Sequence, residues 1–309
     1  MTARVSIVTR TKDRPVFLRR ALASITGQSF EDWALIIVND GGDPSEVAQI
    51  VDELPDQHHR RVTIIDHAAP LGRWEAANAG VRVADGEFLI LHDDDDSWEP
   101  SFLDTAVDYL DRNPDREGVV SRIDIIWERR TGDALEVLGR EPFLPDSVAP
   151  LLMNQQRFNQ FVPIAFLYRR SLHDEIGLYD DSLPVVGDWV FNTRVLERGP
   201  LSYLPGPPLA HWHQRPSGIQ ADGNSVIAES DAHRLHDALV RDAAFRRLVA
   251  TEGSAGPLYF EARLRDTEEM LRRELASMRH DLAHPLLLVY RRLREAIHRF
   301  RGTRRDKLR

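Results

Sequence analysis

The chain of 309 residues contains no cysteine. Disulfide bonds, cysteine metal sites and cysteine nucleophiles are therefore excluded. The chain also has no apolar run of about 18 residues, which is the length that a membrane-spanning helix needs. No apolar signal segment precedes the strand-like run that begins at Val5. We expect a cytoplasmic protein that is either soluble or held peripherally at the inner face of a membrane.

Basic charge gathers at the C-terminal end of the chain. The net charge is −9, but residues 279–309 hold ten Lys or Arg against three acidic residues. The rest of the chain is therefore acidic and would repel a nucleic-acid backbone, so no nucleic-acid partner is expected. Within residues 285–301, apolar side chains fall at helical spacing among arginines. Two interpretations of this segment stay open: peripheral contact with anionic lipid, or packing on the protein or on another subunit.

Strand and helix signals alternate over the first hundred residues. Segments with helical apolar spacing separate short apolar runs at residues 5–8, 34–38, 62–65 and 88–91. This order predicts an α/β fold with a mostly parallel, Rossmann-like sheet flanked by helices. A linker-like stretch from Gly253 to Pro257 precedes two helical segments rich in Arg and Glu. We expect one domain over residues 1–252 and a helical, basic C-terminal extension over 253–309.

Polar clusters directly follow three of the predicted strands. They are Thr11–Arg14, Asn39–Gly42 and Asp93–Asp96. The carboxyl ends of parallel strands meet at one edge of a sheet, and ligands bind beyond that edge. The sequence therefore predicts a binding site built from these clusters.

The acidic run from Asp93 to Asp96 is the sharpest chemical signal in the chain. Four adjacent carboxylates repel one another unless a positive charge lies among them. A hard divalent cation, Mg²⁺ or Mn²⁺, prefers such oxygen ligands. We favour this interpretation over a solvated acidic loop in which Asp96 or Ser97 caps the next helix.

A second carboxylate, Asp188, follows an apolar stretch and a glycine and opens a predicted helix that begins with Trp189. It could cap that helix. It could also act as a general base, which requires a carboxylate across the reacting centre from the leaving group. The sequence by itself leaves both roles open.

Basic and histidine side chains add weaker signals. Arg14 and Arg73 offer bidentate donors suited to phosphate. His211 and His213 share a face of an extended segment, where they could bind a metal or, with Arg215, contact phosphate. The alternative is a packed Trp212 flanked by exposed histidines.

Several segments, taken in order over about residues 4–220, resemble glycosyltransferase family 2. They are Val5–Pro15, Gln28–Phe30, Trp33–Gly41, Gly72–Phe88, Leu91–Pro100 and Ile176–Arg194. The resemblance implies a GT-A fold and an inverting, divalent-metal-dependent enzyme that uses a nucleotide-diphosphate sugar. It also implies a glycan or a lipid-linked glycan as the acceptor.

The same resemblance implies a role for each matching residue. Asp188 would be the general base. Asp95 would be the principal ligand of Mn²⁺ or Mg²⁺. From their own positions in the sequence, Asp93 and His213 are predicted as further ligands. The donor would be bound by Thr11, Asp13, Arg14, Asp40, Arg73, Asp93 and Asp94. The chain departs from the family pattern at Gly187, which replaces an acid before the base, and at His92 and Asp94 around the acidic run.

Two rival functions stay open at this point. A nucleotide-sugar-binding protein without turnover would keep the acidic run but lack a working base. A sugar-nucleotide pyrophosphorylase would need a glycine-rich loop after the first strand, whereas Thr9–Arg14 has no glycine. Because this loop has no glycine, it also lacks the Gly-x-Gly-x-x-Gly pattern of a dinucleotide-binding dehydrogenase, which disfavours that function.

Overall fold

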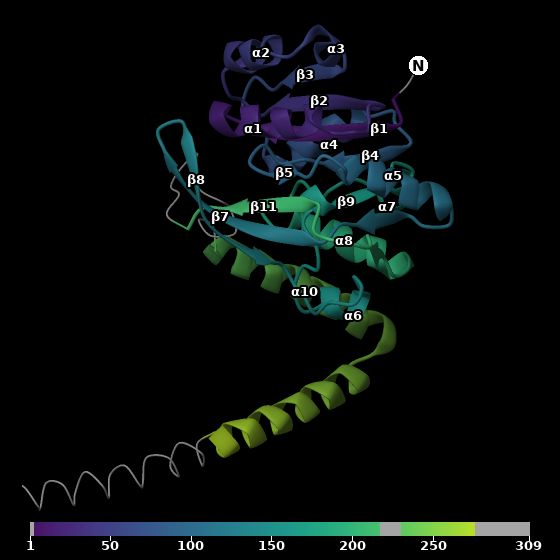
Figure 1. The fold of residues 1–309 in the computed structure, drawn as a ribbon. Coiled ribbons are helices and arrows are strands. Elements are labelled where there is room, and N and C mark those ends of the chain that lie inside the picture. Colours follow the sequence, from purple (N-terminus) through teal and green to yellow (C-terminus); the bar gives the residue numbers. More distant parts are fainter. Residues whose placement is uncertain (1–2, 217–229, 276–309) are drawn as a thin grey trace, which may run out of the picture. The chain divides into compact units, whose positions relative to one another are not determined.

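The computed structural model describes residues 3–216 and 230–275 (Figure 1). The chain divides into two compact units, Met1–Ala238 and Leu239–Arg309. The first unit holds two β-sheets and most of the helices, and it contains every residue of the predicted site. The boundary between the units falls earlier in the chain than the expected end of the first domain at residue 252.

A seven-stranded sheet forms the centre of the first unit, in the order β10-β6-β9-β4-β1-β2-β3. Its strands are β1 (Val5–Thr11), β2 (Trp33–Asn39), β3 (Val62–Asp66), β4 (Phe88–Leu91), β6 (Gly118–Val120), β9 (Phe166–Arg169) and β10 (Ser202–Tyr203). All pairings are parallel except the two made by β9. The prediction of a mostly parallel sheet flanked by helices is confirmed.

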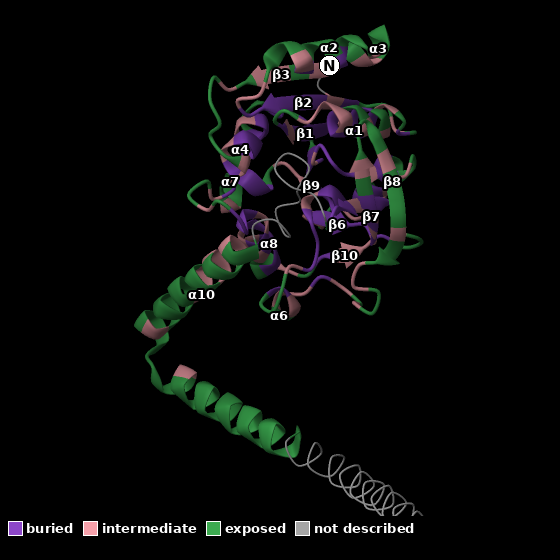
Figure 2. Cartoon of the chain, turned by 90° about the vertical axis from the view of Figure 1, so that its left-hand side faces the viewer, coloured by how far each residue is buried: buried purple, intermediate pink, exposed green. Residues whose placement is uncertain are grey.

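The apolar runs of the sequence become the core of this sheet. Every residue of β4 is buried, and so are Val5 to Thr9 of β1. Figure 2 shows these central strands as the most deeply buried part of the molecule. Burial on both faces explains why the strands read as continuous apolar runs and not as alternating patterns.

Helices follow the strands and bury one apolar stripe each. In α1 (Pro15–Thr26) the buried positions include Phe17, Leu18 and Leu22, which repeat at helical spacing. The other helices of this unit are α2 (Pro44–Asp52), α3 (Asp56–His59), α4 (Arg73–Val83), α5 (Phe102–Arg112), α6 (Leu152–Gln155), α7 (Leu172–Ile176) and α8 (Gly187–Arg198).

A second sheet has the order β5-β11-β7-β8. Its strands are β5 (Ser97–Trp98), β7 (Ile123–Thr131), β8 (Ala134–Pro142) and β11 (Ala210–Gln214). Between residues 118 and 131 the chain forms two strands that belong to different sheets. The chain pairs with the first sheet through β6, leaves it after Val120 and joins the second sheet as β7. Strand β8 was not predicted, because it is largely exposed and lacks the continuous apolar run of a buried strand (Figure 2).

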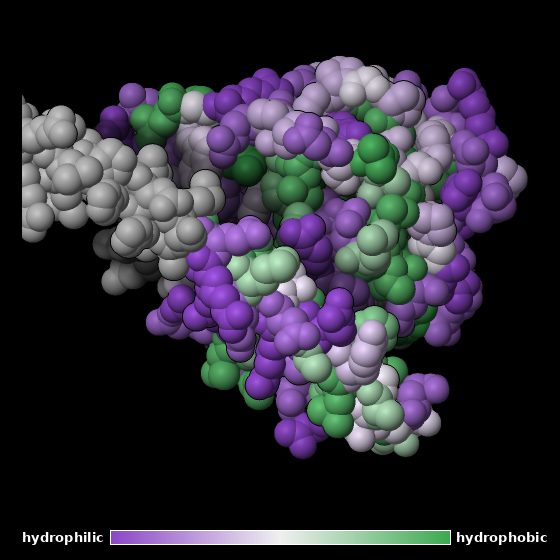
Figure 3. Space-filling view, turned by 90° about the horizontal axis from the view of Figure 1, so that it is seen from below, coloured by the Kyte–Doolittle hydropathy of each residue, from purple (hydrophilic) through white to green (hydrophobic). Residues whose placement is uncertain are grey.

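Helices make up the described part of the chain after residue 230. Helix α10 spans Ser230–Glu252, and a second helical stretch covers residues 255–275. Gly253, with a φ of 78°, breaks the helix where a linker was expected. Apolar side chains such as Leu239, Phe245 and Leu264 are exposed along these helices. The face of the molecule in Figure 3 shows hydrophobic side chains mixed with hydrophilic ones.

Within the residues that the structure describes, no helix is long and apolar enough to cross a membrane. The segment 285–301, for which membrane contact or self-association was predicted, lies outside the described residues.

Candidate functional site

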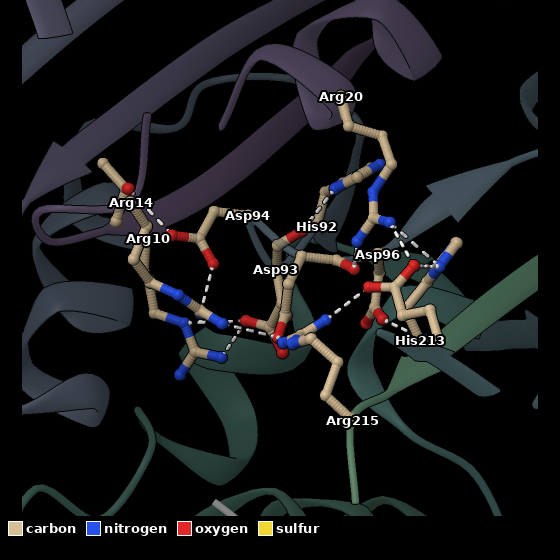
Figure 4. Close-up of polar contacts among 12 residues, drawn as sticks. Arg10, Arg14, Arg20, His92, Asp93, Asp94, Asp96, His213 and Arg215 are labelled. Atoms are coloured by element: carbon tan, nitrogen blue, oxygen red, sulfur yellow. Dashed lines mark hydrogen bonds and ion pairs between the residues drawn. The ribbon is translucent and has the colours of Figure 1, made fainter. Parts of the chain in front are cut away.

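The acidic run leaves the end of β4 and lies beside the end of its parallel neighbour β1. Thr11, the last residue of β1, donates from Oγ1 to Asp94 Oδ2 at 2.8 Å. Arg14, just beyond that strand, donates to Asp94 Oδ1 at 2.6 Å and to Asp95 Oδ2 at 2.8 Å. Two of the predicted clusters therefore meet at the carboxyl edge of the sheet (Figure 4).

Arginines determine the charge state of this run. Burial raises the pKa of Asp94, and Arg14 opposes that rise. Burial also acts to raise the pKa of Asp95, but Arg14 and Arg215 outweigh it and hold that pKa well below its usual range. Burial, together with the neighbouring Asp95, raises the pKa of Asp96 well above its usual range. The positive charges that the run requires are thus supplied by side chains of the chain itself.

Arg20 and Arg215 link Asp95 to Glu128, a residue of β7 that the sequence analysis missed. Glu128 accepts hydrogen bonds from Arg215 Nη1 and Arg20 Nη1, both at 2.6 Å, and pairs with His213 Nδ1 at 2.8 Å. Burial acts to raise the pKa of Glu128, but His213 and Arg20 bring it down to about 2. The sequence held one indication of this role. Glu128 lies two positions after Ile126, so both side chains point to the buried face of the strand.

Arg10 in β1 forms another part of the site that sequence reasoning missed. It pairs with Asp93, and its Nη1 donates to the backbone oxygen of Arg73 at 3.1 Å. Its guanidinium also lies 5.0 Å from the ring centre of Trp74. Figure 4 shows Arg10 and Arg14 on one side of the acidic run, with Arg20 and His213 on the other.

Asp188 lies in the first turn of α8, with Val186 at the N-cap position. Asn159 donates from Nδ2 to Asp188 Oδ2 at 2.8 Å. Burial raises the pKa of Asp188, while the backbone N–H of Trp189 and the charge of Arg10 oppose the rise. Asp93 raises it further, which brings the predicted base into electrostatic contact with the acidic run.

Steric contact with Trp74 explains why Gly187, the residue before Asp188, is a glycine. A Cβ atom at Gly187 would lie 2.6 Å from Trp74 Cε2, closer than such atoms approach in folded proteins. Trp74 itself is buried and stacks on Tyr179, with ring centres 5.5 Å apart. The indole of Trp74 therefore fills the space that an acidic side chain at position 187 would need.

The remaining predicted donor residues lie around the loops after β1 and β2. Asp40 accepts hydrogen bonds from the backbone N–H groups of Leu71 and Gly72, at 2.8 and 3.0 Å, and so orders the loop that leads to Arg73. Asp13 is exposed, has a φ of 52° and accepts from the backbone of Asp43 at 3.3 Å.

The predicted metal ligands do not form a ligand set in this arrangement. Asp93 is paired with Arg10, and Asp95 with Arg14 and Arg215. Both ring nitrogens of His213 are engaged, Nδ1 by Glu128 and Nε2 by Ser97 Oγ at 2.8 Å. Among residues 3–216 and 230–275, no three His, Asp or Glu side chains are placed to hold a metal ion. His211 lies apart from the acidic run, with Nε2 at 2.9 Å from Glu99.

A polar site at the carboxyl edge of a mostly parallel sheet is typical of α/β proteins that bind ligands at that edge. Residues 6–177 match the family described as Glycosyl transferase family 2, and the match covers more than half of the chain. The chain therefore belongs to glycosyl transferase family 2, and the resemblance found in the sequence is confirmed.

Individual relatives agree with this assignment. The chain is 31% identical over 193 residues to the uncharacterized glycosyltransferase YwdF of Bacillus subtilis, which covers 62% of this chain and 67% of that protein. It is 25% identical over 212 residues to an uncharacterized glycosyltransferase of Haemophilus influenzae, covering 65% of this chain and 62% of that protein.

Solved structures share the fold. S. aureus TarS 1–349 in complex with UDP aligns with a TM-score of 0.56 at 18% identity, covering 70% of this chain and 61% of that one. The same TarS fragment with UDP-GlcNAc gives a TM-score of 0.57 at 18% identity, with coverage of 72% and 60%. The chain spans less than two thirds of the TarS fragment and of the Haemophilus protein.

Proposed function

We propose that the protein transfers a sugar from a nucleotide-diphosphate donor to a hydroxyl group of a glycan or lipid-linked acceptor, with inversion at the anomeric carbon. The observation that carries this proposal is the place of Asp188. Asp188 is half-buried, the burial of its carboxylate raises its pKa, and it interacts electrostatically with Arg10 and Asp93. A carboxylate with a pKa shifted toward the working pH suits the role of a general base.

The proposed reaction is a single displacement. Asp188 accepts the proton of the acceptor hydroxyl, and the acceptor oxygen forms a bond to the anomeric carbon. The bond from that carbon to the diphosphate breaks, and the nucleoside diphosphate leaves with the electron pair. Because the oxygen attacks the face opposite the leaving group, the anomeric configuration inverts.

The donor would bind along the edge that joins the loops after β1, β2 and β4. Thr11, Asp13, Asp40 and Arg73 would border the nucleoside, with Asp93 and Asp94 at the ribose. Arg14 is charged and partly exposed, so it could turn from the acidic run toward the diphosphate. The dependence on Mn²⁺ or Mg²⁺ stays a prediction, and no step above passes through an ion.

Two observations weigh against the rival functions. Family membership removes the grounds for a nucleotidyltransferase, whose glycine-rich loop this chain lacks. A binding protein without turnover does not require a carboxylate, such as that of Asp188, whose pKa is raised by burial.

A calorimetric titration with UDP-, GDP- and dTDP-sugars, with and without Mn²⁺, tests the donor class. The proposal expects one nucleotide base to bind clearly more tightly than the others. It expects that binding to weaken in Thr11→Val, which removes a hydroxyl from the edge of the site. Absence of binding to the whole panel would contradict the proposal.

A further inference from the structure

Arg215 is a deeply buried charged group of the site. Its side chain is 1% exposed, as is that of Glu128. Nη1 donates to Glu128 Oε1 at 2.6 Å, and Nη2 pairs with Asp95 Oδ2. The guanidinium thus joins an acid of the loop after β4 to an acid of β7 (Figure 4).

Two buried carboxylates that face each other need a cation between them. Arginine meets this need with a permanent charge and a planar fork of donors that can serve both acids at once. The same geometry has a second consequence. Arg215 already bonds one oxygen of Asp95 and one oxygen of Glu128. A hard metal ion would need these oxygens as ligands.

The other two arginines of the cluster are less suited to this position. Arg14 bridges Asp94 and Asp95, and its side chain is 18% exposed. Arg20 binds the other oxygen of Glu128 and the backbone oxygen of Asp95, and its side chain is 19% exposed. Arg215 alone among the three joins the carboxylate of Asp95 to that of Glu128.

The chain also places Arg215 next to the remaining predicted ligand. His213 lies two positions earlier in the sequence and pairs with the same Glu128 through Nδ1 at 2.8 Å. Any ion held by Asp95, Glu128 and His213 would therefore have to share the space of the Arg215 guanidinium. An ion placed beside an unmoved guanidinium would meet strong repulsion, because like charges a few ångströms apart in a buried site are weakly screened.

We propose that Arg215 takes the position between Asp95 and Glu128 that a divalent cation would need, so that Mn²⁺ binds this site only when Arg215 is displaced. The donor-free protein is then neutralised by its own arginine and has weak affinity for free Mn²⁺. This inference concerns ion binding by the donor-free protein. It can therefore be tested without measuring the transfer reaction.

The test is a titration of the full-length protein with MnCl₂, read by calorimetry and by the electron paramagnetic resonance signal of free Mn²⁺. The variants are Arg215→Gln, which removes the competing charge, and Arg215→Lys, which keeps it. Arg140→Gln is the matched control, because Arg140 lies in β8 of the second sheet and pairs with Asp124 at 2.5 Å. It removes one positive charge without touching Asp95 or Glu128.

The proposal predicts that Arg215→Gln binds one Mn²⁺ at least about tenfold more tightly than the wild type, because the competing charge is gone. Arg215→Lys and Arg140→Gln should bind it as weakly as the wild type. Mn²⁺ should raise the melting temperature of Arg215→Gln and leave that of the wild type unchanged, since the ion would replace the lost buried charge.

Equal Mn²⁺ affinity in the wild type and in Arg215→Gln would overturn the proposal. So would a folded Arg215→Gln that binds no Mn²⁺. If Arg215→Gln does not fold, the wild-type titration decides. Tight one-to-one binding of Mn²⁺ to the donor-free wild type contradicts the proposal, and weak binding supports it.

Discussion

Asn159 donates its side-chain N–H to Asp188 Oδ2 at 2.8 Å. A hydrogen bond to a carboxylate stabilises the ionised form. We therefore expect this hydrogen bond to oppose the rise in the pKa of Asp188 that burial causes. The pair keeps a half-buried carboxylate available as a proton acceptor, which is the property that the proposed mechanism needs.

Removing this donor should move the acid limb of the activity profile. In Asn159→Ala we expect the limb of kcat/KM to shift to higher pH by roughly one unit, because the carboxylate loses a hydrogen bond that favours its charged form. The sign follows from the role of a base: activity falls as the pH drops through the pKa of Asp188. Rates measured from pH 4 to 9 for both proteins check this, and an unchanged limb would exclude Asp188 as the titrating group.

The contact between Gly187 and Trp74 predicts a steric penalty. Gly187→Ala should lower the free energy of unfolding by about 1–3 kcal/mol, since a Cβ would collide with the indole. Gly199→Ala is the control, because a Cβ there meets nothing within 4 Å. Urea denaturation of both variants measures the difference. A Gly187→Ala protein as stable as the control would show that Trp74 moves aside at little cost.

The buried acid of β7 should matter far more than an exposed acid of the neighbouring strand. Glu128→Ala leaves buried Arg215 without one of its acids and should cost about 3–5 kcal/mol of the free energy of unfolding. Glu136→Ala breaks an ion pair with Arg129 whose two side chains are more than half exposed, and should cost less than about 1 kcal/mol. Chemical denaturation measures the free energy of unfolding of both variants. Similar losses in the two would contradict the claim that burial makes the Glu128 contacts more important for stability.

A buried histidine should make the stability depend on pH. His173 contacts Tyr168 Oη through Nε2 at 2.9 Å and the backbone oxygen of Gly177 through Nδ1 at 3.0 Å. Burial lowers its pKa below the value of about 6.5 expected in the unfolded chain. The unfolded state then binds more protons, so stability is full above that value and is lost as the pH falls.

His173→Phe tests this linkage. The melting temperature of the wild type should decline between pH 7.5 and 5, and the variant should decline less steeply over the same range. Parallel curves for the two proteins would assign the pH dependence to other groups.

The strands β1, β2 and β4 could be predicted from the sequence because their burial produces continuous apolar runs. Strand β3 at the edge of the sheet is only partly buried, but its short apolar run was also visible. The acidic run and the loop at Thr11–Arg14 could also be placed, since parallel strands end at a common edge. The antiparallel direction of β9 could not be predicted, because an apolar run carries no sign of its orientation. Strand β8 is largely exposed, and its apolar residues, such as Val137 and Leu138, do not form the continuous run of a buried strand.

The contacts of Arg10, Arg14, Arg20 and Arg215 with the acidic residues could not be predicted from the sequence for a different reason. Arg20 and Glu128 are 108 positions apart, and they meet only because the second sheet lies against the end of the first. Single arginines in the sequence look like solvated surface residues. Which of them are buried on an acid depends on the tertiary structure.

The account depends most on the claim that Asp188 is the base of a nucleotide-sugar transferase. The direct measurement is release of nucleoside diphosphate from a panel of UDP-, GDP- and dTDP-sugars by the wild type and by Asp188→Asn, with donor affinity measured in parallel. The account predicts release from one donor class by the wild type. It predicts a loss of about 10²–10⁴-fold in Asp188→Asn with donor affinity retained. Equal release by the two proteins, or no release from any donor, would contradict it.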